Sequence, residues 1–205
     1  AKMGTPDPDM NPRLRLAVNN AKALSMPKDN IQRAIDKGQS GGGADYADIR
    51  YEGVGPGGVG IIIEASTDNK NRTAAEVRTA VTKNGGTMAD PGSVSYQFAR
   101  KGVIVVVDGT NEDAVLEATI EHDVDDVSAN GDGFVVTCDP SSMVAARAAL
   151  QAAGIDYESA DVEFVSSMKI QADAETATKV IKMIDAIEDL DDVQNVFHNA
   201  EINEE

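Results

Sequence analysis

Apolar and polar positions repeat one pattern four times after about residue 50. Each repeat begins with a short run of β-branched apolar residues, passes a capping residue into a helix, and ends with another strand-like run. Each repeat is therefore predicted to be a βαβ unit. The first and second strands of the four units are predicted at 60–65 and 93–98, at 103–107 and 124–128, at 134–138 and 162–165, and from 168 onward and at 193–197.

Capping residues indicate where the four helices begin, and glycines indicate where two of them end. Gly85 and Gly86 close the first helix, and Gly154 closes the third. The predicted start signals are the capping box of Thr73 and Glu76, then Asn111, Asp139 followed by Pro140, and Asp173.

The order of the units predicts two ferredoxin-like domains. The second and third units are contiguous through the turn Asn130-Gly131-Asp132-Gly133, which gives β-α-β-β-α-β over 102–166. The first and fourth units flank this domain, and neither can bury a sheet face alone. We therefore expect residues 49–101 and 167–205 to form a second α/β domain, with the domain of 102–166 inserted in it. The predicted fold class is α+β.

A helical piece is predicted to precede both domains. Asn11 caps a helix that Pro12 opens, and Pro27 opens a second helix that Gly38 closes, so residues 1–38 form a helical hairpin. Residues 39–48 are rich in glycine and polar residues and are predicted to be a linker. The first four residues resemble the last turn of a helix, so we expect a further N-terminal segment to precede Ala1 in the intact protein.

Charge divides the chain into two halves. Residues 1–103 hold fourteen of the eighteen Lys and Arg against eleven acids, whereas the rest holds four bases against twenty-four acids. Such asymmetry indicates a part that faces a polyanion and a part that repels nucleic acid and anionic membranes. An acidic protein whose charge only keeps it dispersed remains an alternative. No apolar run approaches a membrane span and no signal peptide is visible, so we expect a cytoplasmic protein.

Several kinds of chemical site are disfavoured. The glycines in GVGPGGVG match a dinucleotide fingerprint as a string, but Gly60 opens a strand rather than a helix. His122, His198 and the lone Cys138 make no metal-ligand set, and no nucleophile motif occurs. We therefore expect no enzyme activity, no cofactor and no metal. The strand KGVIVVV also lacks the aromatic residues on which RNA-recognition sheets stack bases.

One loop cluster does point to a ligand. The segment TDNKNRT, 67–73, lies at a predicted helix N-terminus, where free backbone N–H groups favour anions. The alternative is that Asp68 and Asn69 only cap this helix. We predict that nucleic acid contacts Arg13, Arg15, Lys22, Lys28, Arg33, Lys37, Lys70, Arg72, Arg78, Lys83, Arg100 and Lys101, and that Asp68, Asn69, Thr73, Glu76, Gly92 and Ser93 shape the loops.

Long motifs resemble those of the YebC family. They are NPRLR at 11–15, MPKDNIQRAIDKG at 26–38, YEGVGPGGVGIIIEASTDNKNRTAAEVR at 51–78, and PGSVSYQF at 91–98 followed by KG. That family includes bacterial probable transcriptional regulators and the mitochondrial translational activator of cytochrome c oxidase subunit I. The resemblance implies three domains and no enzyme activity. It also implies a basic helical segment before the present start, and Met88-Ala89-Asp90 stands where relatives often carry Leu-Gly-Glu.

Two functions are compatible with these expectations. The first is a DNA-binding transcriptional regulator whose basic half meets the duplex backbone. The second is a translation factor that docks on folded ribosomal RNA. A protein partner for the acidic domain is a third alternative. No membrane and no small-molecule substrate is expected in any of them.

Overall fold

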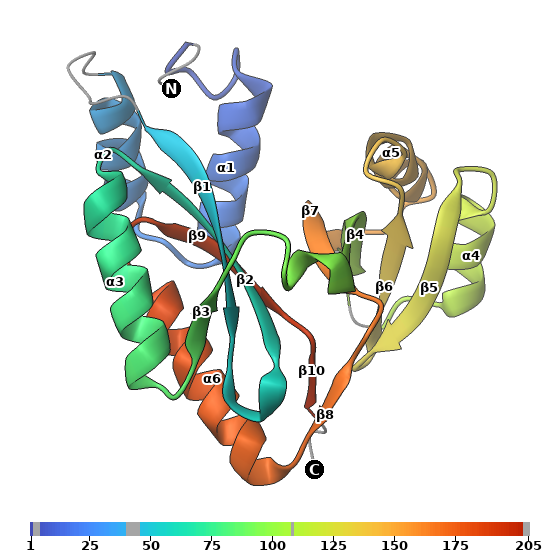
Figure 1. Ribbon diagram of the computed structural model, residues 1–205. Coiled ribbons are helices and arrows are strands. Elements are labelled where there is room, and N and C mark those ends of the chain that lie inside the picture. Colours follow the sequence, from blue (N-terminus) through green and yellow to red (C-terminus); the bar gives the residue numbers. More distant parts are fainter. Residues whose placement is uncertain (2–4, 40–45, 108, 203–205) are drawn as a thin grey trace. The chain divides into compact units, whose positions relative to one another are not determined.

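The computed structural model describes residues 1, 5–39, 46–107 and 109–202, which divide into two compact units, Ala1–Asp45 and Tyr46–Glu205. The smaller unit holds helices α1 (Pro12–Ala23) and α2 (Lys28–Gln39) (Figure 1). As predicted, the Asn11 side chain caps α1 and accepts a 3.1 Å hydrogen bond from the Leu14 N–H. Val18, Ile31 and Ile35 are the buried core between the two helices.

The larger unit begins with an antiparallel four-stranded sheet in the order β3-β1-β2-β9. Helices α3 (Lys70–Lys83) and α6 (Ala174–Glu188) pack on one face of it. Ile61 and Ile63 alternate toward these helices, whereas Ile62 points to the other face, as the two-residue period of a strand requires. The strands are β1 (Ala47–Val54), β2 (Gly60–Thr67), β3 (Thr87–Ala89) and β9 (Val193–His198), with a small parallel pair formed by β8 (Ile170–Ala172) and β10 (Ala200–Ile202).

A second antiparallel sheet, in the order β5-β6-β4-β7, lies in sequence between β3 and β8. Its helices α4 (Glu112–Thr119) and α5 (Met143–Ala152) bury one face around Ile104, Val136 and Leu150. This strand order is that of a ferredoxin-like fold, and the predicted α+β class is confirmed. The strands are β4 (Phe98–Val106), β5 (Val124–Asn130), β6 (Gly133–Cys138) and β7 (Tyr157–Ser166).

The predicted strand 93–98 is wrong. Residues Thr87–Ala89 pair with β1 instead, and Ser95–Gln97 form a 3-10 turn before β4 begins. The physical reason is the Glu52 carboxylate, which binds the backbone N–H groups of the segment 92–95 and takes them away from any sheet ladder.

Three further local predictions differ from the structure. Asn69, not Thr73, is the N-cap of α3, and its side chain accepts from the Arg72 N–H at 3.1 Å. Ser142 takes the cap position of α5, while the Asp139 carboxylate accepts from the Ser141 N–H. The end of the predicted linker belongs to β1, which begins at Ala47. The linker residues 40–45 lie outside the described part.

A buried asparagine forms hydrogen bonds to both segments of the chain that connect the two sheets. Asn199 is 1% exposed, and its side-chain oxygen accepts from the Gly60 N–H at 2.7 Å. Its amide donates to the Gln97 side chain at 2.6 Å and to the Met168 carbonyl at 3.1 Å. Gln97 precedes β4 and Met168 follows β7, so one side chain fixes the chain where it enters and leaves the second sheet.

The turn between β1 and β2 offers a matched pair of glycines. Gly57 and Gly58 have φ values of +71° and +77°, which other residues adopt only with strain. A Cβ on Gly57 would lie 2.6 Å from the Thr176 methyl of α6, whereas one on Gly58 would meet nothing within 4 Å. We expect Gly58→Ala to lower the free energy of unfolding by about 1 kcal/mol and Gly57→Ala by about 2 kcal/mol, measured by urea denaturation. Equal losses would show that Thr176 simply moves aside.

Candidate nucleic-acid interface

The smaller unit carries six of the predicted cations, all exposed, on its two helices. Arg15 has a local role, because its side chain donates to the backbone carbonyls of Pro8, at 3.1 Å, and Asp9. Arg13, Lys22, Lys28 and Arg33 form no ion pair or side-chain hydrogen bond with the residues that the structure describes. Their charges are therefore available to a ligand.

Arg72, at the centre of the predicted loop cluster, is held by two carboxylates. Its guanidinium lies 2.8 Å from Asp68 and 2.9 Å from Asp192. The hydrogen bond to Asp192, and then that to Asp68, raises the pKa of Arg72. Asn69 caps the helix beneath it. The loop is thus shaped as the capping alternative predicts, and Arg72 is largely neutralised within the chain.

Asp192 holds this loop in place, and it was not among the predicted site residues. It is 8% exposed and accepts from the Thr73 hydroxyl at 2.7 Å and from the Thr67 hydroxyl at 3.3 Å, besides Arg72. The hydrogen bonds from Arg72 and Thr73 hold the pKa of Asp192 below its ordinary value. Asp192 lies just before β9, more than one hundred residues from its partners, so no local pattern marks it.

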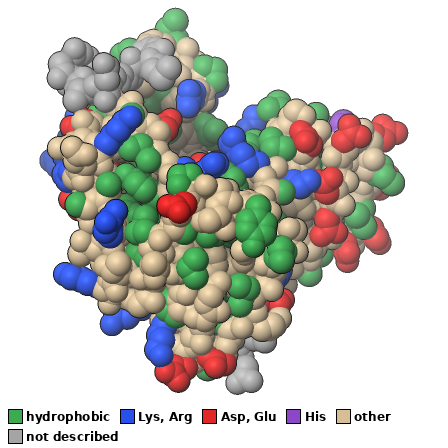
Figure 2. Space-filling model, viewed as in Figure 1, with side chains coloured by type: hydrophobic (Ala, Val, Ile, Leu, Met, Phe, Trp, Pro, Cys, Tyr) green, Lys and Arg blue, Asp and Glu red, His purple; other side chains and the backbone are tan. Residues whose placement is uncertain are grey.

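Lys70, Arg78 and Lys83 extend along the exposed side of α3, and their side chains form no ion pair or hydrogen bond within the described part of the chain. Figure 2 shows Lys and Arg side chains over the region of α3, whereas Asp and Glu gather over α4 and β5. Glu76 is half-buried on the same helix and takes no part in a capping box. α3 therefore presents three exposed cations, Lys70 from the predicted loop segment and Arg78 and Lys83 farther along the helix.

Glu52 holds the loop that contains Gly92 and Ser93. This carboxylate is 3% exposed and accepts from the backbone N–H groups of Gly92, Val94 and Ser95 at 2.6, 3.0 and 2.6 Å. Burial alone would raise the pKa of Glu52, but the three N–H donors together outweigh it and leave the pKa below its ordinary value. Gly92 has a φ of +88°, and the Ser93 hydroxyl donates to the Asp90 carbonyl at 2.5 Å. Gly92 and Ser93 thus lie in a turn that the Glu52 side chain of β1 holds in place.

The adjacent pair Arg100 and Lys101 on β4 divides between two roles. Lys101 forms an ion pair with Asp125 at 2.8 Å, and this contact raises the pKa of Lys101. Arg100 points to the other side of the strand, where its guanidinium carbon lies 5.8 Å from the centre of the Phe164 ring. Arg50 of β1 lies over the same ring at 5.3 Å. Arg50 was not among the predicted site residues.

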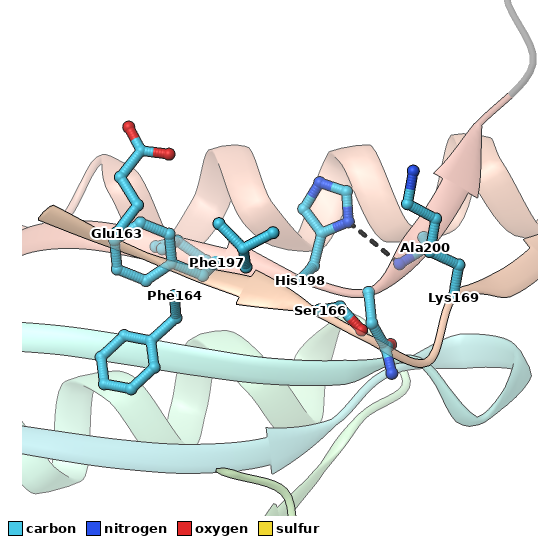
Figure 3. Close-up of a pocket in the computed structure, with 10 residues that line it drawn as sticks. Glu163, Phe164, Ser166, Lys169, Phe197, His198 and Ala200 are labelled. Atoms are coloured by element: carbon cyan, nitrogen blue, oxygen red, sulfur yellow. Dashed lines mark hydrogen bonds between the residues drawn. The ribbon is translucent and has the colours of Figure 1, made fainter. Parts of the chain in front are cut away.

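Phe164 sits where the two sheets meet. Its ring is 5.6 Å from that of Phe197 on β9, and both pack against Ile62 and Phe98. Figure 3 shows Glu163 on the opposite side of β7 from the Phe164 ring. Glu163 lies in a cavity of about 300 Å³ with His198, and burial raises the pKa of Glu163 and lowers that of His198. This carboxylate therefore does not face the arginine pair.

A separate cavity of about 510 Å³ lies beside β1 and β3. Arg50 from β1 and Arg78 from α3 both line it, together with the segment 87–91. Arg78 was predicted to contact nucleic acid and Arg50 was not, so the structure places the two beside one cavity. Its wall also carries two carboxylates, those of Glu52 and Asp90. The two arginines and two carboxylates balance in formal charge, but Glu52 is buried and turned to three backbone N–H groups, so Arg50 and Arg78 remain the exposed cations of this wall.

Two other kinds of site, a metal centre and a membrane span, find no support in the described residues. Within the described ranges, no three His, Cys, Asp or Glu side chains are placed to hold a metal ion together. Among the same residues, no helix combines the length and apolar character needed to cross a bilayer. The glycines of 53–60 form the turn between two antiparallel strands, so the dinucleotide fingerprint is absent there.

Comparisons with known proteins agree with the fold. A model of the TACO1/YebC N-terminal domain matches residues 1–41, and one of the TACO1/YebC second and third domains matches residues 46–200. Proteins named probable transcriptional regulatory protein are 56% identical in Leifsonia xyli, over 100% of this chain and 83% of that protein, and 52% identical in Thermobifida fusca, over 100% and 84%. The crystal structure of a conserved hypothetical protein from Aquifex aeolicus is 42% identical with a TM-score of 0.84, covering 100% of this chain and 85% of that one. The chain belongs to the TACO1/YebC family.

Proposed function

We propose that this protein is a non-enzymatic, cytoplasmic regulator of gene expression that binds nucleic acid, with duplex DNA as its first ligand. The names of its relatives support a role in transcription. The observation that supports nucleic-acid binding is a set of exposed cations that have no acidic partner among the described residues. They are Arg13, Lys22, Lys28 and Arg33 on the smaller unit and Lys70, Arg78 and Lys83 on α3.

The inserted domain restricts where nucleic acid can bind. Residues 102–166 carry fourteen acids and one base, Arg147, a net charge of −13. Such a domain repels phosphates, so the contacts belong to the helical unit and the first sheet's domain. Leu116 on its helix α4 and Ile120 just after that helix are also exposed, by 42% and 79%, beside acidic residues. We propose this side for a protein partner.

Folded ribosomal RNA is the second candidate ligand. The two arginines over Phe164 favour it, because guanidinium groups stack on the unpaired bases that folded RNA presents and duplex DNA does not. Co-sedimentation with ribosomes, with excess duplex DNA as competitor, separates the two ligands. Ribosome binding that DNA cannot displace would favour translation, and ready displacement would favour transcription.

Salt dependence tests the cationic interface. We expect the logarithm of the binding constant to fall linearly with the logarithm of the salt concentration, because each phosphate contact releases counterions. Lys28→Gln and Arg78→Gln should each reduce this slope by about one. Lys182→Gln, an exposed cation of α6 outside the proposed set, is the control and should leave it unchanged. A slope near zero for the unaltered protein would rule out the proposed interface.

A further inference from the structure

Phe164 brings together two arginines from different sheets. Arg50 comes from β1 of the first sheet, and Arg100 lies directly opposite Phe164 in the β4–β7 register of the second. Their guanidinium carbons are 5.3 and 5.8 Å from the ring centre, so the two charges are at most about 11 Å apart. Both side chains are exposed.

No acid in the described part of the chain forms an ion pair with either arginine. Three nearby carboxylates have other positions or partners. Glu52 binds backbone N–H groups, Glu163 points away on the far side of β7, and Glu64, opposite Arg50 in the β1–β2 register, lies beyond ion-pair distance. Asp48 and Glu64 both line a neighbouring cavity with Arg50, but among the described residues neither forms an ion pair with it. Two like charges held close and unneutralised favour an anion between or beside them.

The cavity beside β1 and β3 adjoins this arginine pair, and its wall also carries Glu52 and Asp90. Arg50 also lines the space of about 510 Å³ that Arg78 borders, so three guanidinium groups follow one path from α3 to the Phe164 ring. A cavity of this volume suits a unit the size of a small ligand, not the side of a duplex. One nucleic-acid strand carries a phosphate about every 3.4 Å along the helix axis, so phosphates of a single strand can reach these arginines together.

A guanidinium held against an aromatic ring also presents a flat outer face. Bases that are not stacked in a helix stack on such faces, and Arg binds phosphate in two-point contacts that Lys cannot copy. We propose that Arg50 and Arg100, positioned by Phe164 and continued by Arg78, bind an unpaired stretch of a nucleic-acid strand. This inference rests on the proposed function and specifies the form of nucleic acid that enters the junction of the sheets.

The test uses fluorescence anisotropy with the full chain and a labelled ten-nucleotide RNA without secondary structure. The DNA strand of the same sequence and the matching duplex are run beside it. We expect Arg50→Gln and Arg100→Gln each to weaken binding of the unpaired strand about tenfold, and duplex binding less than threefold. Arg50→Lys should restore only part of the loss, because it keeps the charge and not the planar group. Lys182→Gln is the matched control.

Phe164→Leu provides a second, independent readout. It keeps an apolar side chain at the junction but removes the ring, so Arg50→Gln should cost less binding in this background than alone. Unchanged affinity in both arginine variants, or an equal loss for strand and duplex, would overturn the inference and leave the proposed function standing. If the full chain binds none of the three probes, both fail. If the RNA strand binds more tightly than the DNA strand, the site is assigned to RNA. If the two bind equally, the site is assigned to unpaired strands of either kind.

Discussion

Replacing Glu52 by Gln is expected to lower the free energy of unfolding by about 3 kcal/mol. The variant keeps the shape of the side chain but loses the charge that three backbone N–H groups share. Hydrogen bonds to a charged acceptor contribute about 1.5–3 kcal/mol each, and buried donors left without an acceptor add a penalty. The amide of the new side chain can satisfy these donors only in part. The segment 92–95 should become less ordered in the variant, in addition to the fall in the free energy of unfolding.

Urea denaturation measures the difference, and Glu64→Gln is the matched control. Glu64 lies on the neighbouring strand β2, is half-buried and forms no ion pair with any described residue, so its replacement should change stability by less than about 0.5 kcal/mol. The pH dependence gives a second check. Since the folded-state pKa of Glu52 is lowered, its contribution is fully present above the unfolded pKa and disappears as the pH falls through the folded one. A gap between protein and variant that persists into strong acid would contradict this account.

The pattern of the sequence was sufficient for the class of fold because strands and helices here obey local rules. Ile61 and Ile63 alternate with Ile62, Asn111 and Asp173 cap their helices, and Gly131 makes the tight turn between β5 and β6. The error at 93–98 arose where a distant side chain decides the structure. The apolar and β-branched residues there favour a strand, but Glu52, about forty positions away, binds their backbone.

The candidate site was harder to predict for the same reason. Charge and helix position singled out Arg72 and Lys101, yet both turn out to pair with carboxylates, one of them contributed by a residue over one hundred positions away. Arg50 gave no signal, because a lone arginine in a strand next to polar residues resembles any solvated position. Its significance depends on Phe164, which reaches it only through the packing of one sheet against another.

Removing Asp192 is the second change expected to have a large effect. Asp192→Ala takes the shared acceptor from Arg72, Thr73 and Thr67, and we expect a loss of about 2–3 kcal/mol in the free energy of unfolding. Asp191→Ala, next to it and exposed, should be nearly neutral. Because the pKa of Asp192 is lowered in the folded state, the loss should be present at neutral pH and shrink as the pH falls through that pKa.

A double-mutant cycle assigns the loss to the loop anchor. In an Arg72→Ala background, Asp192→Ala should cost less, because one of its partners is already gone. Purely additive losses would show that Asp192 stabilises the fold without Arg72. The cycle also decides how binding variants are read: Arg72→Glu would place a third carboxylate beside Asp68 and Asp192, so weaker nucleic-acid binding in that variant would report a damaged loop. Lys70→Gln and Arg78→Gln are the changes on α3 that test contact with nucleic acid itself, because these two side chains have no partner within residues 1, 5–39, 46–107 and 109–202.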